Sequence, residues 1–342
     1  MTDAHWTQLL EIIDGKVFDR PLAAFIIDSP WLPAWAGISI LDYFSSEQKW
    51  YDANLKAIDE FPEIAFLPGF WSEFGMCTEP SAFGTKCIWG ENEFPTAVKL
   101  PSGVADIVEA GVPNPATDGL CPLVLKRLEH FESPIQAGGH QIRFAVARGP
   151  LNIASFLMGT TEFLTAMKTD PVEIEKLLEL ITDFIVDWLR LQKNRFPSID
   201  GIFLLDDIAG FIGPDDFVQS GKPYFTRAFA AFDASVKLFH NDAHGLVCAP
   251  HLREMGVNVF NFSHNHSVAD IRRLAGDSVV LLGNIPPRDV LAAGTEAQVT
   301  ASAAALVRSL PNARRVIFSC GGGMPPGVSS ANIRAFLVGV GH

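Results

Sequence analysis

The sequence has few cysteines and no long apolar run. Its five cysteines are scattered and include no Cys-x-x-Cys pair, which argues against a disulfide framework and favours reduced thiols. No uninterrupted run of about 18 apolar residues occurs, and the segment Met1–Lys16 carries acids and no unbroken apolar stretch. We therefore expect a soluble cytoplasmic protein with neither a signal peptide nor a membrane partner.

Basic charge is also scarce. Lys and Arg number 26 against 39 Asp and Glu, which leaves a formal net charge of -13. A nucleic-acid phosphate backbone would be repelled by this charge, so we expect no nucleic-acid partner. The chain also contains no G-x-G-x-x-G, GK[ST] or G-x-S-x-G pattern, and nucleotide binding and serine hydrolysis therefore lack support.

What the sequence does contain is typical of one large globular domain. Hydrophobic residues make up 48% and charged residues 19% of the 342 residues, a balance that excludes a disordered protein. The length would accommodate two average domains, but α/β barrels commonly reach it as one. Since no internal repeat, linker or charge block divides the chain, we predict a single domain over residues 1–342.

Short apolar runs rich in β-branched and aromatic residues predict buried strands. Most show little alternation, as expected of strands that are covered on both faces. The predicted strands are Leu22–Asp28, Ile64–Phe70, Gln141–Arg148, Ile202–Asp206, Val236–Asp242, Val257–Ser263, Val279–Ile285 and Arg315–Cys320.

Helical spacing of apolar residues occurs between these runs. It is clearest over Pro171–Phe196, where Asp170 is the expected N-cap and Pro171 suits the first helical position. The other predicted helices are Glu47–Phe61, Pro214–Ser235, Val268–Ala275, Pro287–Leu310 and Ser330–Val340. Alternation of strands and helices predicts an α/β fold, a (β/α)8 TIM barrel, with a doubly wound open sheet as the alternative.

The stretch near residues 71–140 is longer than an ordinary loop between a strand and a helix. It contains an expected hairpin over Cys87–Leu100, with Gly90, Glu91 and Asn92 near its turn. We predict that this stretch is an insertion over the mouth of the barrel.

Titratable or ligand-capable side chains occupy nearly every predicted strand end. In a barrel the catalytic groups lie at these carboxyl ends, although Asp, Asn and Gly are also common there as turn formers and helix caps. The collection favours an enzyme, and its members are Asp28, Arg148, Asp206, Asp207, His240–His244, His264, His266, Asn284 and Cys320 with the three glycines that follow it.

His240 and Asp242 lie two residues apart on one predicted strand. Side chains alternate with period two, so both point to the same face. Imidazole and carboxylate groups can bind zinc, and Cys320 could add a thiolate. The alternative for His240 is a core histidine bonded to a carbonyl. A D-x-H-x-x-G cobalamin signature is ruled out because Val247 occupies its glycine position.

Aromatic residues cluster after the first two predicted strands, where the wall of an active site would lie. Trp31, Trp35, Phe70 and Trp71 could form an apolar or aromatic substrate pocket. Burial in the core is the alternative for each of them.

Several longer motifs resemble the uroporphyrinogen decarboxylase superfamily. Residues 322–334 read GGMPPGVSSANIR and resemble its closing GxGMPPGTPxENI motif, and residues 149–159, GPLNIASFLMG, resemble its GPxxxASxLxG segment. Residues 205–207, 256–259 and 283–295 match further parts of the pattern. The resemblance covers roughly residues 20–340 and implies a (β/α)8 barrel.

Within that superfamily the chain is more similar to the corrinoid-dependent methyltransferases than to the decarboxylases. The decarboxylases open with an RQAGRYMPEY-like segment whose arginines hold porphyrinogen carboxylates, whereas residues 28–35 here read DSPWLPAW without arginine. Glu79, in the segment TEPSAFG over residues 78–84, fits the acid and glycine segment of the methyltransferase branch, which includes methylcobalamin:coenzyme M methyltransferases and O-demethylase components.

The resemblance implies a zinc site that is altered in this chain. Relatives that use zinc carry H-x-C and a distant cysteine in GCG; here His240 is kept, Asp242 replaces the middle ligand, and Gly322 replaces the last, with Cys320 two residues upstream. Oxygen ligands would leave zinc more Lewis acidic than thiolates would, which suits polarisation of a methyl ether oxygen.

We therefore predict a methyltransferase that moves a methyl group between a small methylated substrate, such as a methoxylated aromatic compound, and cobalamin carried by a separate corrinoid protein. Catalysis is assigned to Asp206, Asp207 and His240, and metal binding to His240, Asp242 and Cys320. Substrate binding is assigned to Trp31, Trp35, Phe70, Trp71, Glu79, Arg148, His264 and Asn284.

Two alternatives stay open beside this prediction. The first is a decarboxylase or another lyase that uses Asp206 or Asp207 for proton transfer. The second is a non-catalytic barrel that binds a small molecule. A homodimer is one option for the assembly.

Overall fold

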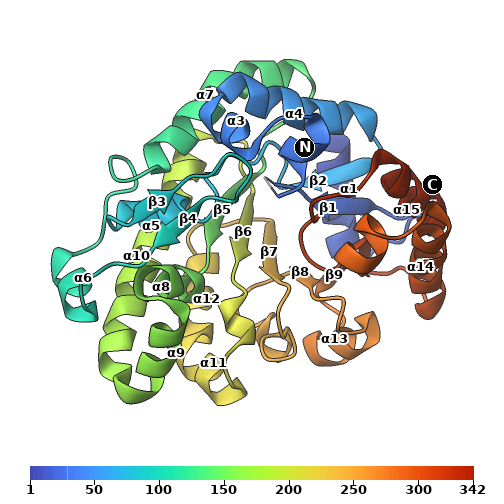
Figure 1. Cartoon of the computed structure of the whole chain (residues 1–342). Helices are drawn as coiled ribbons and strands as arrows, with labels where there is room; N and C mark the ends of the chain where they lie inside the picture. The colour runs from blue at the N-terminus through green and yellow to red at the C-terminus, as the bar shows by residue number, and fades with distance from the viewer. Residues whose placement is uncertain (29) are drawn as a thin grey trace.

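A computed structural model describes residues 1–28 and 30–342. Eight parallel strands form one curled sheet in the order β2-β1-β10-β9-β8-β7-β6-β5, and helices surround it (Figure 1). The strands are β1 Ala23–Ile26, β2 Ile64–Leu67, β5 Phe144–Arg148, β6 Gly201–Leu205, β7 Val236–Asn241, β8 Val259–Phe262, β9 Val280–Ile285 and β10 Val316–Cys320. Each falls within a predicted strand except β6, which begins one residue earlier at Gly201, and the (β/α)8 prediction is confirmed.

The barrel is open at one seam. No ladder between β2 and β5 is recorded in the described part of the chain, and the predicted insertion lies between these two strands in sequence. Its hairpin is present, with β3 Lys86–Ile88 paired antiparallel to β4 Thr96–Val98. Trp71 follows β2 and packs its ring on Phe203 of β6, with centroids 5.7 Å apart, so it fills part of the interior.

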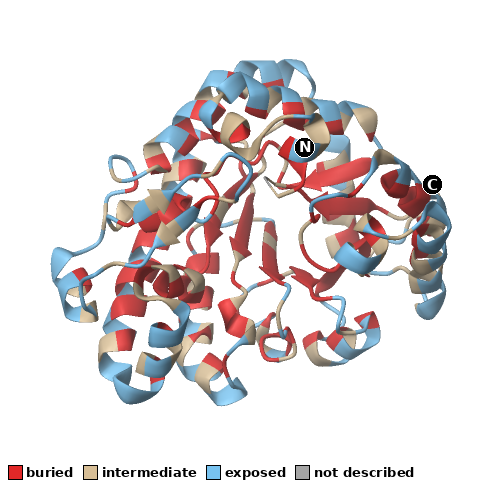
Figure 2. Ribbon diagram, viewed as in Figure 1, coloured by how far each residue is buried: buried red, intermediate tan, exposed pale blue. Residues whose placement is uncertain are grey.

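Both faces of the sheet are buried (Figure 2). Alternate strand residues pack inside the barrel, as Phe203 and Leu238 do, while their neighbours pack beneath the helices. This arrangement explains the near-continuous apolar strands, because a parallel sheet must satisfy a core on each side. The same alternation sets which polar residue points into the mouth where each strand ends.

The helices of the described residues are α1 Asp3–Ile13, α2 Leu32–Ala36, α3 Ile40–Ser45, α4 Glu47–Glu60, α5 Thr78–Ala82, α6 Val104–Ala110, α7 Cys121–Ala137, α8 Pro150–Met158, α9 Thr160–Thr169, α10 Pro171–Arg195, α11 Pro214–Ser220, α12 Lys222–Phe229, α13 Val268–Ala275, α14 Glu296–Ser309 and α15 Ser330–Val340. None combines the length and the apolar character that a membrane crossing needs.

Two predicted helices differ from the structure. The segment Pro214–Ser235 forms α11 and α12, because Gly221 interrupts it, and the chain leaves the helix at Ala230. The segment Pro287–Leu310 forms a short π-helix over Pro287–Ala292 and then α14, which Thr295 caps. Asp170 precedes α10 as predicted, but its side chain bonds to Thr169 and makes no cap hydrogen bond.

Helix α1 covers the amino-terminal end of the barrel and was not among the predicted helices. Its buried residues Trp6, Leu9 and Ile12 join the interior cluster. Trp6 meets Phe144 of β5 edge to face at 5.4 Å. Helix α1 therefore packs against the interior side chains at the end of the barrel opposite the carboxyl ends of the strands.

Candidate active site

A cavity of about 440 Å³ lies at the carboxyl ends of the strands. Strand-end side chains from four strands line it, namely Asp28 after β1, Arg148 of β5, Asp207 after β6, and His240 with Asp242 at the end of β7. Each continues the inward-facing series of its strand, as Asp207 continues Phe203 and Leu205 of β6. The strand ends therefore supply most of the charged and titratable side chains of this wall.

Asp207, His240 and Asp242 form a compact cluster in this cavity. Each offers one ligand atom, and the three atoms lie within 4.8 Å of one another. The backbone N–H of Asp242 donates to Oδ1 of Asp207 at 2.9 Å, and Nε2 of His240 lies 3.8 Å from the same oxygen. Burial raises the pKa of Asp207 to about 6; the charge of Asp242 also raises it, and His240 opposes the shift.

The orientation of the His240 ring is fixed by Asn261 on the neighbouring strand. The register pairs these residues directly, and Nδ1 of His240 lies 2.7 Å from Oδ1 of Asn261. The Asn261 amide nitrogen donates to the carbonyls of Leu282, at 2.8 Å, and Cys320, at 3.4 Å. Since this leaves Oδ1 to face the ring, Nδ1 is the donor, and Nε2 is turned toward the two aspartates.

The cluster fits a divalent metal ion. It provides one imidazole nitrogen and two carboxylates, a set of three protein ligands that leaves coordination positions open, as in catalytic sites. A metal-binding histidine normally donates its other N–H to a neighbouring oxygen, as His240 does to Asn261. Gly322 packs against the cluster, because a Cβ atom there would lie 2.8 Å from Oδ2 of Asp242.

Cys320 does not join this cluster. The inward positions of β10 are Ile317 and Ser319, so Cys320 faces the outer core, where it is fully buried. Its thiol donates to the carbonyls of Gly322 and Gly323, and burial raises its pKa to about 12. The structure therefore groups His240 and Asp242 with Asp207 in place of the predicted thiolate.

Asp206 points away from the cavity as well. Its Oδ2 accepts the backbone N–H groups of Leu151 and Asn152, at 2.9 and 3.0 Å, in the first turn of α8, and its Oδ1 accepts that of Ala209. Burial raises the pKa of Asp206 to about 7, against the effect of these donors. The geometry gives Asp206 a structural role, anchoring α8, and corrects its assignment to catalysis.

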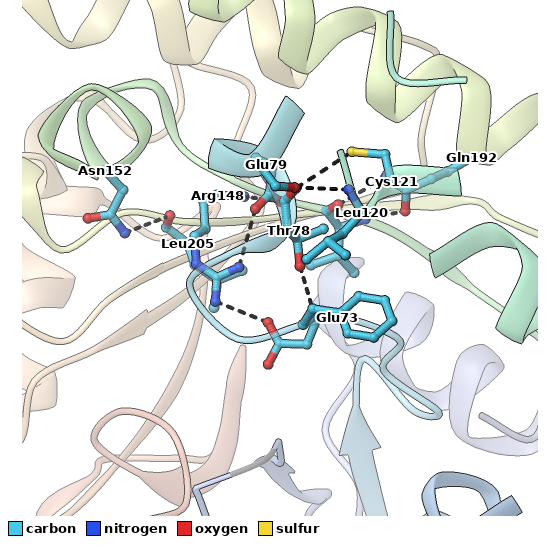
Figure 3. Close-up of polar contacts among 12 residues, drawn as sticks. Glu73, Thr78, Glu79, Leu120, Cys121, Arg148, Asn152, Gln192 and Leu205 are labelled. Atoms are coloured by element: carbon cyan, nitrogen blue, oxygen red, sulfur yellow. Dashed lines mark hydrogen bonds and ion pairs between the residues drawn. The ribbon is translucent and has the colours of Figure 1, made fainter. Parts of the chain in front are cut away.

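A second polar group lies beside the cavity, around Arg148 (Figure 3). The Arg148 guanidinium donates to Oε2 of Glu79 at 3.3 Å and to Oε2 of Glu73 at 3.0 Å, and its backbone N–H donates to Oε1 of Glu79. Glu73 and Glu79 are each only 3% exposed. Glu79 therefore acts on the cavity through Arg148 and does not line it.

Of the four aromatic residues predicted to bind substrate, only Trp71 lines the cavity. Trp31 is fully buried, stacks on Trp35 at 4.9 Å and donates to the carbonyl of Val328. Trp35 donates to Ser330, and Phe70 stacks on Tyr51. Burial, the alternative kept for these residues, holds for Trp31 and Phe70, while Trp35 is partly buried at the edge of the core.

His264 and Asn284 lie near the mouth but outside the cavity lining. His264 is exposed in the turn after β8, and a Cβ atom at Gly321 would contact its backbone. The Asn284 amide donates to the carbonyl of His266 at 2.5 Å. Their predicted role in substrate binding is not supported by a place in the cavity wall.

Asn261 and Glu73 were not among the predicted site residues. The signal for Asn261 is its period-two spacing from Val259 within the predicted strand, which puts it on the inner face. Glu73 lies in an irregular segment after β2, where no pattern predicts its direction. Asp28 was noted only as a strand end, although it lines the cavity.

Fold and cavity together define a parallel α/β barrel with an acid and imidazole cluster at the end where barrel enzymes hold their active sites. The chain belongs to the uroporphyrinogen decarboxylase (URO-D) family, whose model matches residues 7–340. The superfamily resemblance and the barrel prediction are thereby confirmed.

Individual relatives fall into two groups. Uroporphyrinogen decarboxylase of Thioalkalivibrio sulfidiphilus is 23% identical over 312 residues, 87% of this chain and 85% of that protein. A methylated-thiol:coenzyme M methyltransferase of Methanosarcina mazei is 22% identical over 242 residues, 69% of this chain and 63% of that protein. A solved methyltransferase structure from Methanosarcina mazei matches with a TM-score of 0.82 at 17% identity, covering 98% of this chain and 97% of its own; at this identity it shows a shared fold.

Proposed function

We propose that this protein is a methyltransferase that moves a methyl group between a small methylated substrate and the cobalt of a separate corrinoid protein. The observation that carries the proposal is the Asp207, His240 and Asp242 cluster, which presents one imidazole nitrogen and two carboxylates to a cavity at the barrel mouth. Similarity to the methyltransferase relatives supports the reaction class.

The chemistry requires help for a poor leaving group. As the methyl carbon is transferred, its bond to the heteroatom breaks and the electron pair stays on the heteroatom, which takes up a proton from solvent. The new bond uses the electron pair of cob(I)alamin. A divalent metal ion such as zinc would supply Lewis acidity at that heteroatom. Asp207, His240 and Asp242 would hold the ion, with Asn261 fixing the ring of His240.

Charges around the cavity disfavour a porphyrinogen substrate. Asp28, Asp207 and Asp242 line it, so the many carboxylates of a porphyrinogen would meet negative charge. Arg148 also lines the cavity, but its Nη1 and Nη2 already donate to Glu79 and Glu73. Arg288 is the other arginine recorded in the lining. Decarboxylation of uroporphyrinogen is thus the less favoured activity, although relatives of that name are among the similar proteins.

The experiment is a methylation assay on purified protein with and without added zinc. Cob(I)alamin is mixed with a panel of methyl ethers, methyl thioethers and methylamines, and formation of methylcobalamin is followed by absorbance. We expect one donor class to react, and a chelator to abolish the reaction. Coproporphyrinogen is measured in a parallel reaction with uroporphyrinogen.

The outcomes separate the candidate functions. Methylcobalamin that forms only with protein and donor supports methyl transfer. Coproporphyrinogen without methylcobalamin would make the protein a decarboxylase, and binding of donors without either product would favour a non-catalytic barrel.

A further inference from the structure

The carboxylates around Arg148 outnumber the positive charges near them. Glu73 and Glu79 both bind this one guanidinium, and Asp28 lies within electrostatic reach of Glu73 and Arg148. The nearby Arg127 donates through Nη2 and Nη1 to the backbone carbonyls of Phe44 and Glu73, and its charge acts on Glu73. Three carboxylates therefore face two guanidinium groups. Since buried carboxylates require compensation, the group lacks a positive charge.

One oxygen of Glu73 is left without a partner. Oε2 accepts from Arg148, while Oε1 is buried and has no hydrogen-bond partner in the described part of the chain. Figure 3 shows this second oxygen on the side of the carboxylate away from Arg148. A buried oxygen without a hydrogen-bond partner destabilises the protein unless a ligand binds to it or the carboxylate takes up a proton.

Asp28 places a further carboxylate at the surface of the cavity. It lines the cavity, as does Arg148, whereas Glu73 lies behind them. Three aromatic side chains, Trp71, Phe94 and Phe156, line the same cavity. Aromatic faces beside a carboxylate attract organic cations, which is how quaternary ammonium groups are commonly recognised.

We infer that the cavity binds a small organic ammonium group against Asp28, with Glu73 behind it and the aromatic side chains around it. The inference rests on the proposed function and names its substrate class, a small molecule with a cationic nitrogen at one end. Its methyl-bearing atom would face Asp207, His240 and Asp242, which lie in the same cavity.

A proton takes the place of the cation when the cavity is free. Burial raises the pKa of Glu73 to about 7, and burial together with the charge of Glu73 raises the pKa of Asp28 well above its usual range. A bound cation favours the ionised carboxylates, so binding should release protons and strengthen from pH 6 to pH 8. The charged and titratable groups that act on or respond to Glu73 are Asp28, Arg148, Glu79, Arg127, Tyr43 and Cys77.

The test uses calorimetric titration of the whole protein with choline and with its neutral isostere 3,3-dimethyl-1-butanol, without cobalamin. We expect choline to bind at least about tenfold more tightly than the isostere. Repeating the titration at pH 7 in two buffers of different ionisation enthalpy should show proton release. Equal affinity for choline and the isostere would overturn the inference. So would a competition titration in which K⁺, added as KCl, binds the same site as tightly as choline does.

Variants add a check on the residues. Asp28→Asn and the near-isosteric Glu73→Gln should each weaken choline binding about tenfold and leave binding of the isostere unchanged. The exposed Asp233→Asn serves as the matched control, and circular dichroism confirms folding. If choline binds as expected but no donor is demethylated, the proposed function is wrong and the inferred ammonium site stands. If neutral donors react and choline does not bind, only this inference fails.

Discussion

His240 is the residue on which the candidate metal site depends. Its ring is held through Nδ1 by Asn261, and its other nitrogen faces two carboxylates. Such a bond fixes the tautomer and the direction of the ring, and loss of the partner typically lowers metal affinity 10- to 100-fold.

Asn261→Ala should therefore reduce zinc affinity by about 10- to 100-fold, measured by competition with a chromophoric chelator. Asn258→Ala is the matched control, since Asn258 bonds to Lys237 and Ser235 at the opposite end of the strands. Equal zinc affinity in the two variants would show that Asn261 does not position the ligand.

The adjacent residues Asp206 and Asp207 should differ in their effects on turnover and stability. Asp207→Asn removes a charged group of the cluster and should lower turnover by about 10² or more. Asp206→Asn disturbs the acceptor of three backbone N–H groups; it should leave turnover within a few-fold and lower the free energy of unfolding by about 1–3 kcal/mol. Kinetics and urea denaturation of both variants test this, and matching losses of turnover would contradict the assignment.

At the scale of elements, the turn after β10 shapes the cluster. Gly322 has a φ of +117°, and a side chain there would meet the Asp242 carboxylate at 2.8 Å. Gly322→Ala should thus displace Asp242 and weaken zinc binding by about tenfold or more. Gly323→Ala is the control, because its Cβ atom would have only one neighbour, at 4.0 Å. Titration with zinc measures both, and an unaffected Gly322→Ala would remove Asp242 from the ligand set.

Helix α1 has a structural role far from the cavity. Trp6 is 5% exposed and packs on Phe144 and Arg143 at the closed end of the barrel. Trp6→Ala should lower the free energy of unfolding by about 3–5 kcal/mol. Because the cavity is at the other end, zinc affinity of the folded variant should be unchanged. A stability loss below about 1 kcal/mol would contradict this role.

The elements differ in how far the sequence predicts them. Strands such as β9 are predictable because a sheet covered on both faces leaves a continuous apolar run. The break between α11 and α12 depends on Gly221, where a Cβ atom would meet Phe217 at 2.8 Å, a contact that no periodicity reveals.

The candidate site was predictable to the extent that strand alternation decides direction. Counting by two from Phe203 selects Asp207 over Asp206, and counting from Ile317 turns Cys320 outward. The meeting of Glu73 and Glu79 with Arg148 was not predictable, since these residues are brought together by an irregular segment and by contacts across about 70 positions.

At the scale of the whole molecule, the barrel brings residues from distant parts of the chain to one cavity. The cavity combines a cluster suited to a divalent metal with a wall that contains Asp28 and Arg148, and the buried Glu73 lies behind Arg148. The net charge of -13 adds a negative field that favours neutral or cationic substrates over polyanions.

The most direct test of methyl transfer is a single-turnover reaction of zinc-loaded protein with cob(I)alamin and a methyl donor carrying isotopic label in the methyl group. The account predicts that the label appears in methylcobalamin with the unaltered protein, at a rate about 10² or more above that with Asp207→Asn. Label that stays in the donor across the ether, thioether and amine panel, or the same rate in both proteins, would contradict it.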